Sequence, residues 1–211
     1  MQTSSACRLV LASASPARRA LLQAAGIDVD VIVSGVDESV VEDREADALC
    51  ATLARMKAET VAERLRVAGK HADTVVLGCD SVLAFDGEIL GKPGDADVAV
   101  KRWRAMRGRT GVLYTGHHLV DLRGDGVAIG GVGSTVVAFA DVSDDEIDAY
   151  VATGEPLWVA GAFTIDGLGG VFVERIDGDH GNVVGVSLPL LRRLLGELGV
   201  PVTSLWRKDA L

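Results

Sequence analysis

Two serines and an arginine stand where an apolar stretch gives way to a helix-forming one, in LASASPARRALLQAAG (residues 11–26). Ser15 suits the N-cap of the following helix. A helix N-terminus offers unpaired N–H groups and partial positive charge, to which Ser13 and Ser15 add hydroxyls and Arg18 a guanidinium. This combination favours binding of an anion, above all a polyphosphate. Alternatively, Ser15 only caps the helix and Arg18 faces solvent.

Carboxylates follow two expected strands elsewhere in the chain. Asp80, in GCDS, comes after an apolar run, and Asp37 and Glu38 come after another. A carboxylate at a strand exit is often functional, and two of them could share a hard divalent cation that also binds phosphate. Acidic residues also occur as plain turn residues. We favour the turn for Asp37 and a function for Asp80, because Gly78 and Cys79 before it are typical of a buried strand.

A lysine with restricted surroundings completes the candidate chemistry. Lys92 stands between Gly91 and Pro93 in GEILGKPGD, which presents its charge on a rigid loop. A lysine so placed can reach a phosphate. Taken alone, the motif is equally compatible with a surface lysine.

The composition of the chain limits the class of protein and of ligand to which these residues could belong. The chain has 211 residues, 48% hydrophobic and 24% charged, with a net charge of −9. That balance is typical of a globular protein and argues against binding a nucleic acid polymer, so any positive site must be local. Three dispersed cysteines, Cys7, Cys50 and Cys79, fit a reducing compartment better than a disulfide framework. No apolar run reaches membrane-spanning length, so we expect a cytoplasmic protein without membrane contact.

Hydrophobic periodicity and turn signals predict the elements that must position these residues. Asp86-Gly87 is a hairpin signal, and Ser143 with Glu146 forms a capping box. Strands are expected at residues 8–12, 28–33, 74–78, 81–85, 112–122, 127–139 and 171–176, and helices at 16–25, 43–68, 94–107, 144–152 and 187–198. Interleaved strands and helices with hairpins predict a mixed α/β sheet. We expect one compact domain over residues 1–211, two-lobed around a cleft.

Several motifs, in order over roughly residues 8–195, resemble the Maf family. They are LASASPARRALL, VDE, GCDSVLAFDGEILGKP, GEPLWVAGAF, GLGGVFVERIDGD and NVVGVSLPLL. The resemblance implies nucleoside triphosphate pyrophosphatase activity, in which a triphosphate and water give a monophosphate and pyrophosphate. It also implies a divalent metal (Mg²⁺ or Mn²⁺), a cytoplasmic location, often a homodimer, and an elongated mixed sheet with flanking helices, similar to the inosine-triphosphatase fold.

The resemblance also assigns roles to particular residues. The matching residues are Asp80 as the proton acceptor, Ser13, Ser15 and Arg18 as the phosphate-binding loop, Glu38 with Asp80 as metal ligands, and Lys57 and Lys92 as cations facing the triphosphate. Asp80 would orient or deprotonate water for in-line attack at the α-phosphorus. Positioning and electrostatics supply most of the catalysis in such chemistry.

One subgroup of the family prefers dTTP and UTP and carries Arg, Thr, DKAG and Gln at its specificity positions. This chain has other residues at these positions. Here those positions are Ala17, Ser81, WVAG and Asp166. An acidic residue at the last position resembles the subgroup acting on 7-methyl-GTP, because a carboxylate accepts hydrogen bonds from a guanine edge. Trp158 could stack on a base. Core packing of Trp158 and a turn role for Asp166 are the alternatives, so a purine preference is a hypothesis.

Other readings of the sequence remain open. The family's name comes from a proposed role in restraining septum formation, so a nucleotide-binding regulator with little turnover is the second candidate function. A sugar-nucleotide transferase is a third. His117 and His118 fall in an expected strand and therefore on opposite faces, which indicates structural roles. The pairing of Asp80 with Glu38 favours the hydrolase.

Overall fold

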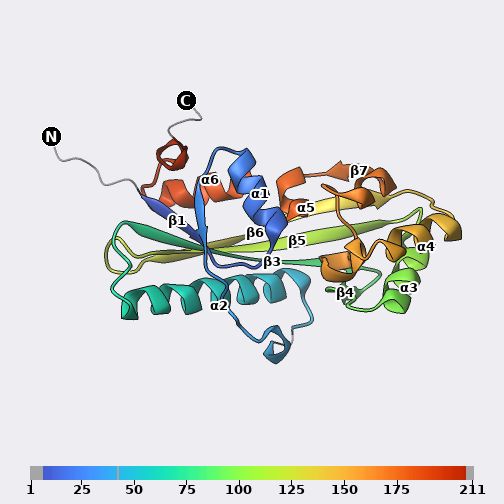
Figure 1. Ribbon diagram of the computed structural model, residues 1–211, viewed down its shortest axis with the longest axis horizontal. Coiled ribbons are helices and arrows are strands. Elements are labelled where there is room, and N and C mark those ends of the chain that lie inside the picture. Colours follow the sequence, from blue (N-terminus) through green and yellow to red (C-terminus); the bar gives the residue numbers. More distant parts are fainter. Residues whose placement is uncertain (1–6, 42, 208–211) are drawn as a thin grey trace.

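A long twisted sheet forms the centre of the protein, whose computed structural model describes residues 7–41 and 43–207 (Figure 1). Its strands are β1 (Arg8–Leu11), β2 (Val29–Val31), β3 (Thr74–Phe85), β4 (Glu88–Leu90), β5 (Thr110–Asp121), β6 (Ala128–Phe139) and β7 (Val173–Asp177). Their order is β2-β1-β3-β5-β6-β7, with β4 paired to β3. Strand β1 is parallel to both β2 and β3. The pairs β3–β4, β3–β5, β5–β6 and β6–β7 are antiparallel. The predicted mixed α/β sheet is confirmed.

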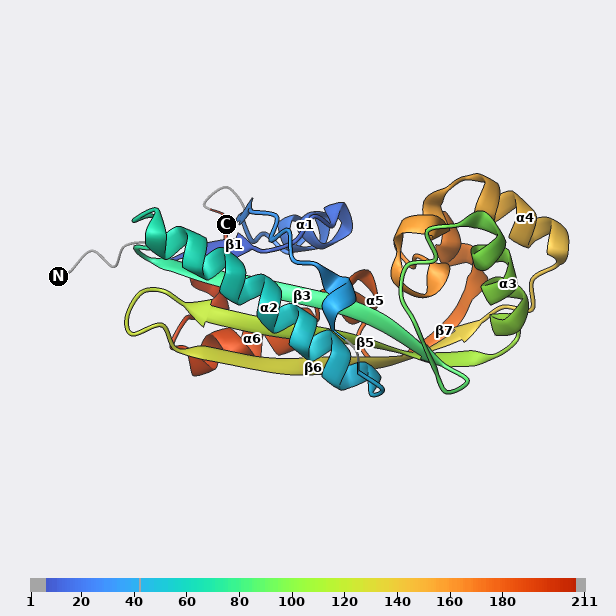
Figure 2. The same cartoon turned by 90° about the horizontal axis from the view of Figure 1, so that it is seen from below.

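Helices cover both faces of this sheet and one end of it. They are α1 (Pro16–Ala24), α2 (Ala46–Val67), α3 (Ala96–Met106), α4 (Asp144–Ala152), α5 (His180–Val184) and α6 (Leu188–Glu197). Helix α2 runs along one face, and α1 and α6 lie on the other. Figure 2 shows α3 and α4 gathered with β7 as a smaller lobe at one end of the elongated molecule. Among the described residues, no helix combines the length and apolar character that a membrane crossing requires.

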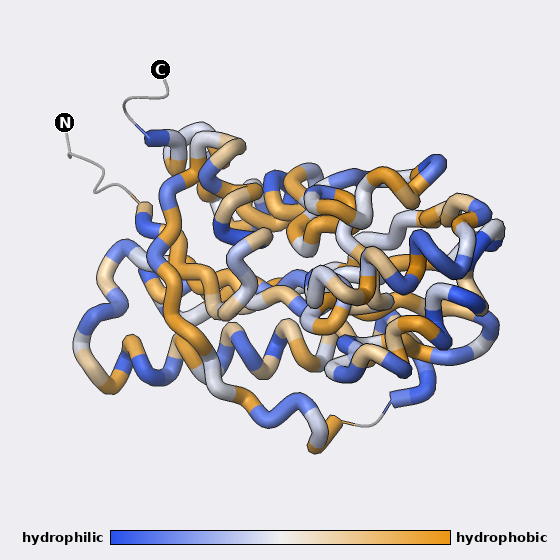
Figure 3. The backbone as a smooth tube through the Cα atoms, turned by 45° about the vertical axis from the view of Figure 1, so that its right-hand side comes forward, coloured by the Kyte–Doolittle hydropathy of each residue, from blue (hydrophilic) through white to orange (hydrophobic). Residues whose placement is uncertain are grey.

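Each layer has its own buried core. Leu77 and Leu191 belong to the core between the sheet and α6, and Val76 and Ala58 to the core under α2. In the smaller lobe, Trp103 packs edge-on against neighbouring aromatic rings and donates its indole N–H to a backbone carbonyl at 2.7 Å. Figure 3 shows long hydrophobic segments in the strands and an alternation of hydrophobic and hydrophilic residues along helices such as α2. The two lobes therefore have separate cores joined by the long strands.

Local sequence signals explain where several elements begin. The Ser15 hydroxyl accepts a hydrogen bond from the Arg18 N–H at the start of α1. Ser143 and Glu146 form the expected capping box at α4. Asp86 and Gly87 both have positive φ, 55° and 82°, in the β3–β4 hairpin. These predictions are confirmed.

The expectation that Asp80 follows the end of a strand is wrong. Strand β3 is continuous, because β5 pairs with it from Val75 to Ala84. Helix α2 also begins later than expected, at Ala46, and residues 168–172 form a 3₁₀ helix before β7. Helix α5, which begins at His180, is not among the helices expected from the sequence.

Candidate active site

The site forms where one edge of β3 is left open. On this edge β1 pairs with residues 74–77, and β4 pairs with residues 83–85. Between them, residues 78–82 face neither strand. A cleft of about 1520 Å³ opens beside this gap, between the two lobes.

All of the predicted site residues meet at this cleft. Its lining includes Ser13, Ser15, Ala17, Arg18, Glu38, Lys57, Asp80, Ser81, Lys92, Trp158 and Asp166. They come from the β1–α1 turn, the first turn of α1, the segment before α2, α2 itself, β3, the loop after β4 and the smaller lobe. The chain thus gathers into one pocket residues that are up to about 150 positions apart in sequence.

Two glycines allow α2 to lie directly on the strands beneath the cleft. A Cβ at Gly78 would stand 2.2 Å from the Ala54 carbonyl oxygen, and one at Gly116 would stand 2.3 Å from the Cys50 carbonyl oxygen. Both distances are far below van der Waals contact, so only glycine fits. This close approach brings Lys57 of α2 to the open part of β3.

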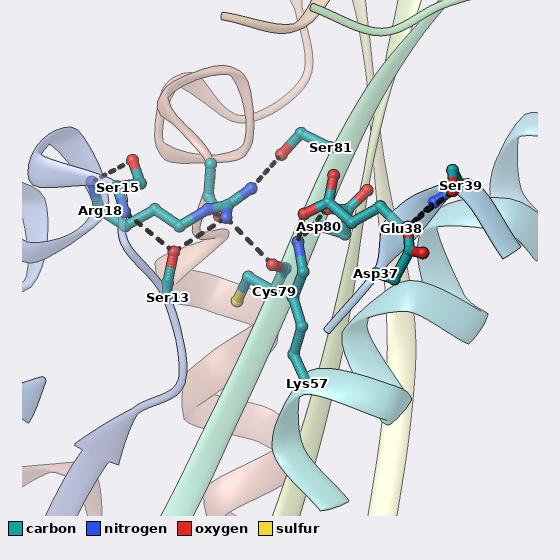
Figure 4. A network of polar contacts seen from close by, with 11 residues as sticks. Ser13, Ser15, Arg18, Asp37, Glu38, Ser39, Lys57, Cys79, Asp80 and Ser81 are labelled. Carbon is teal, nitrogen blue, oxygen red and sulfur yellow. Dashed lines mark hydrogen bonds and ion pairs between the residues drawn. The ribbon is translucent and has the colours of Figure 1, made fainter. Parts of the chain in front are cut away.

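Lys57 joins two of the carboxylates that line the cleft, those of Asp80 and Glu38. Its Nζ lies 2.5 Å from Asp80 Oδ1 and 2.7 Å from Glu38 Oε1 (Figure 4). Lys57 and Asp80 are each 7% exposed, whereas Glu38 is exposed. Partial burial raises the pKa of Glu38, but the hydrogen bond and charge of Lys57, with the charges of Lys92 and Arg18, bring it below its ordinary value. Glu38 is therefore held as an anion.

Glu38 is placed by its neighbours in the segment before α2. Asp37 caps a short 3₁₀ helix, accepting hydrogen bonds from the Ser39 N–H and hydroxyl at 3.0 and 2.6 Å. Arg64 of α2 donates to the carbonyls of Val33 and Ser34 at 3.0 and 2.5 Å. Asp37 thus acts as a turn residue, as favoured from the sequence. Arg64 was missed, because an arginine on a helix surface carries no local signal of its partner.

Arg18 reaches β3 from the face opposite Lys57. It is 9% exposed, and its guanidinium donates to the Gly185 carbonyl (3.0 Å), the Ser13 hydroxyl (3.2 Å), the Cys79 carbonyl (3.0 Å) and the Ser81 hydroxyl (2.9 Å). The alternative in which Arg18 faces solvent is wrong. Its bond to Cys79 uses a carbonyl in the part of β3 that has no partner strand on the edge away from β5.

The outer part of the cleft is built differently. Lys92, Trp158 and Asp166 are all exposed, Trp158 to 70%. The alternative in which Trp158 packs in the core is therefore wrong. Lys92 lies close enough to Glu38 for its charge to lower the pKa of that carboxyl. The outer cleft presents a cation, an aromatic ring and a carboxylate on loops and 3₁₀ turns.

A carboxylate behind the outer cleft organises the loop that carries Asp166. The groups that donate to Glu155 are the Tyr150 hydroxyl (2.9 Å), the Thr164 hydroxyl (2.5 Å) and the N–H groups of Leu168 and Gly169 (3.0 Å each). Sequence reasoning missed Glu155, because its partners converge only in the folded smaller lobe.

The donor set fits a divalent cation that also binds phosphate. Glu38 and Asp80 lie on either side of one ammonium group, so their oxygens already share a cation. No group of three or more metal-ligating side chains occurs within residues 7–41 and 43–207. Mg²⁺ is commonly held by one or two carboxylates together with substrate phosphates and water. Glu38 and Asp80, two carboxylates in a cleft that also holds cationic side chains, match that pattern.

The two adjacent histidines have structural surroundings. His117 is 1% exposed, and its Nε2 accepts a hydrogen bond from the Ser187 N–H at 2.8 Å. Burial lowers its pKa to about 4, so the ring is neutral near pH 7. The charges nearest His118 are those of Glu59 and Arg55, on α2. The two rings thus lie on opposite faces, as predicted.

Comparison with known proteins identifies the family. A family model described as Maf-like protein matches residues 8–198. The chain belongs to the Maf family. A relative from Salinispora tropica, named nucleoside triphosphate pyrophosphatase, is 66% identical over 201 residues, covering 95% of this chain and 88% of its own. One of the same name from Streptomyces avermitilis is 56% identical, covering 94% of each chain. Among solved structures, the Staphylococcus aureus Ham1 protein is 15% identical, covering 90% of this chain and 99% of its own, with a TM-score of 0.47.

Proposed function

We propose that this protein is a nucleoside triphosphate pyrophosphatase, which uses water to convert a triphosphate into a monophosphate and pyrophosphate. Membership of the Maf family and the names of its curated relatives support this activity. The observation that carries it is the buried Asp80 carboxylate in a cleft that also holds Arg18, Lys57 and Lys92. This combination suits a substrate that is strongly anionic and must be attacked by a neutral nucleophile.

Charge neutralisation is the first task of the cleft. The whole chain has a net charge of −9, yet Arg18, Lys57, Lys92 and the N-terminus of α1 converge on one pocket. Fixed cations and dipoles in a partly dry site stabilise developing phosphate charge more than solvent does. A triphosphate would therefore enter with its phosphates toward α1 and β3.

Activation of water is the second task. The Asp80 Oδ1 atom is held by Lys57, while Oδ2 takes no hydrogen bond from the described residues. Oδ2 is thus the atom that can orient a water molecule and accept its proton. Attack at the α-phosphorus leaves pyrophosphate as the departing group, facing the cationic side chains.

Glu38 and Asp80 would hold Mg²⁺ or Mn²⁺ together with the substrate phosphates. When bound, such an ion shields phosphate charge and lowers the pKa of a coordinated water. We expect EDTA to abolish pyrophosphate release and added Mg²⁺ or Mn²⁺ to restore it. Glu38→Gln should raise the metal concentration needed for half-maximal rate. Full activity in excess EDTA would contradict the proposal.

The outer cleft is the proposed base site. Trp158 offers a face for stacking, and Asp166 offers acceptors for the N–H groups of a guanine edge. Ala17 and Ser81 replace the larger residues of the pyrimidine subgroup. These residues support a preference for purine nucleotides, including modified ones.

A nucleotide panel tests the activity and the base preference together. Purified protein is incubated with Mg²⁺ or Mn²⁺ and each of GTP, ATP, 7-methyl-GTP, dTTP and UTP, and pyrophosphate and monophosphate are measured. We expect equimolar products and the highest kcat/KM for a purine. Best turnover of dTTP and UTP would refute the purine preference alone. Binding without turnover across the panel would favour the regulatory function instead.

Two further properties stay proposals. A cytoplasmic location is supported by three free cysteines, of which Cys50 and Cys79 are buried with pKa values raised to about 12, mainly by desolvation. The homodimer expected from the family is tested by measuring the molecular mass by light scattering as the protein elutes from a size-exclusion column. A mass near 22.0 kDa would show a monomer.

A further inference from the structure

A chain of hydrogen bonds runs from Arg18 into the sheet, on the face opposite Lys57. Arg18 Nη2 donates to Ser81 Oγ at 2.9 Å, Ser81 Oγ lies 2.9 Å from Thr115 Oγ1, and Thr115 Oγ1 donates to the Asn182 carbonyl at 2.8 Å. Ser81 and Thr115 are cross-strand partners in β3 and β5. Thr115 and Asn182 are fully buried, and neither lines the cleft.

The donors and acceptors of this chain can point in one direction only. A carbonyl oxygen only accepts, so the single hydrogen of the Thr115 hydroxyl is used on Asn182. Thr115 must then accept the hydrogen of Ser81, and Ser81 in turn accepts from Arg18. The chain is polarised away from the cleft, with a cation at one end and a peptide carbonyl at the other. Ser81 therefore has no hydrogen left to donate to a nucleotide.

Two hydrogen-bond donors near the start of α1 stay available for the substrate. Arg18 has five N–H groups, and bonds to Gly185, Ser13, Cys79 and Ser81 use four of them. Within the described ranges, the second N–H of Nη2 has no acceptor. The Ser13 oxygen accepts from Arg18 and from the Ser15 N–H, so its own hydrogen is also available. One guanidinium N–H and one hydroxyl thus remain as donors beside the cleft.

We propose that Ser81 and Thr115 are positioning residues that fix the rotation of the Arg18 guanidinium, so that its remaining N–H and the Ser13 hydroxyl are held ready for a phosphate oxygen. The proposal rests on the proposed function, for which Arg18 binds the triphosphate. It assigns Ser81 an action through Arg18 and not through a hydrogen bond donated to the base. Thr115, which does not itself line the cleft, affects phosphate binding only through Ser81 and Arg18.

The decisive variants are Thr115→Val, which keeps the branched shape without the hydroxyl, and Thr115→Ser, which keeps the hydroxyl. Thr115→Val should lower kcat/KM by roughly tenfold, the size expected when one bond in a chain ending on a charged group is lost. Thr115→Ser should stay within about twofold of the parent protein. Equal losses in both variants, or no loss in Thr115→Val, would overturn the proposal.

A double-mutant cycle separates positioning from general damage to the fold. In an Arg18→Lys background there is no planar guanidinium whose rotation the chain could fix, so adding Thr115→Val should change kcat/KM by less than about twofold. The same tenfold loss in both backgrounds would show that Thr115 acts independently of Arg18. If Thr115→Val fails to fold, Ser81→Ala breaks the chain one link nearer the cleft and should give the same non-additivity with Arg18→Lys.

Calorimetry of inorganic pyrophosphate binding tests the same positioning of Arg18 without requiring turnover. Thr115→Val should weaken pyrophosphate binding by roughly tenfold and Thr115→Ser by less than about twofold. If the parent protein releases no pyrophosphate from any nucleotide but shows this binding pattern, the proposed function fails and the positioning role stands. Unchanged pyrophosphate binding in Thr115→Val, with an active parent protein, overturns the positioning role alone.

Discussion

The two ends of the cleft differ in how firmly their residues are held. At the deep end, Asp80, Lys57 and Arg18 are at most 9% exposed and lie on a strand and two helices, bonded to one another or to the sheet. At the outer end, Trp158 and Asp166 are exposed on a 3₁₀ turn and a loop. A preorganised deep end suits chemistry common to all triphosphates, and an open outer end suits the part of the substrate that varies.

Replacing one carboxylate oxygen with an amide NH2 group, once at each end of the cleft, should sharpen this contrast most. Asp80→Asn should lower kcat by about 10²–10⁴-fold, because an amide cannot accept a proton from water. Asp166→Asn, the matched change at the outer end, should alter the ratio of kcat/KM between purine and pyrimidine nucleotides and leave kcat within about threefold. Pyrophosphate release is the measurement, with thermal unfolding as the control for folding. Near-normal turnover by Asp80→Asn would remove that carboxylate from the mechanism.

Acid should destabilise the protein through a residue next to the deep end. His117 has a pKa of about 4 in the fold, against an ordinary 6.5, because burial disfavours its charged form. The unfolded chain therefore binds the proton more readily between these values, and stability falls as pH drops from 6.5 towards 4. The integrated loss in the free energy of unfolding is about 3 kcal/mol.

Urea unfolding across this pH range measures that loss. His117→Gln, which keeps an acceptor for the Ser187 N–H but does not titrate, should give a flatter dependence on pH. An identical slope in both proteins would assign the acid sensitivity to other groups.

Substitution of Lys92, an exposed residue whose charge acts on the catalytic region, tests how sharply the two ends of the cleft differ. It is exposed but acts electrostatically on Glu38, so Lys92→Ala should lower kcat by roughly tenfold through lost charge on the phosphates. This tenfold loss should shrink at high salt, because salt screens the exposed charge that Lys92 supplies. Lys101→Ala, which removes an exposed lysine outside the cleft, is the matched control and should leave kcat unchanged. An unchanged kcat in Lys92→Ala would confine catalysis to the buried residues.

The smallest effect is expected from the exposed aromatic ring of the outer cleft. Trp158→Ala should raise KM by about three- to tenfold, because stacking of a base on an aromatic ring is lost, and should leave kcat nearly unchanged. Trp158→Phe should recover most of the affinity. Steady-state kinetics with the preferred nucleotide distinguish these outcomes. A large fall in kcat would contradict the division between the two ends.

Much of the fold was predictable because its signals are local. The Ser15 cap, the Asp86-Gly87 hairpin and the Ser143 capping box each depend on a few consecutive residues, and each is confirmed. The alternating faces of a strand also placed His117 and His118 correctly. The continuity of β3 was missed: separate strands were expected at residues 74–78 and 81–85, whereas pairing with β5 keeps the chain extended from Val75 to Ala84.

The candidate site was harder to predict where it depends on distant contacts. Sequence motifs singled out Asp80 and Lys57, but not the 2.5 Å ion pair between them, which requires the close approach of α2 over Gly78. Nothing near Thr115 in the sequence signals its bond to Asn182, which is 67 residues away. Such partners become visible only when the sheet order is known.

Isotope labelling tests most directly whether the deep end of the cleft directs water to the α-phosphorus. The preferred nucleotide is hydrolysed by the parent protein in water enriched in ¹⁸O, and the monophosphate and pyrophosphate are separated and weighed by mass spectrometry. Attack guided by Asp80 predicts one ¹⁸O atom in the monophosphate and none in the pyrophosphate. Label in the pyrophosphate would show attack at the β-phosphorus and would contradict the proposed arrangement of substrate and carboxylate.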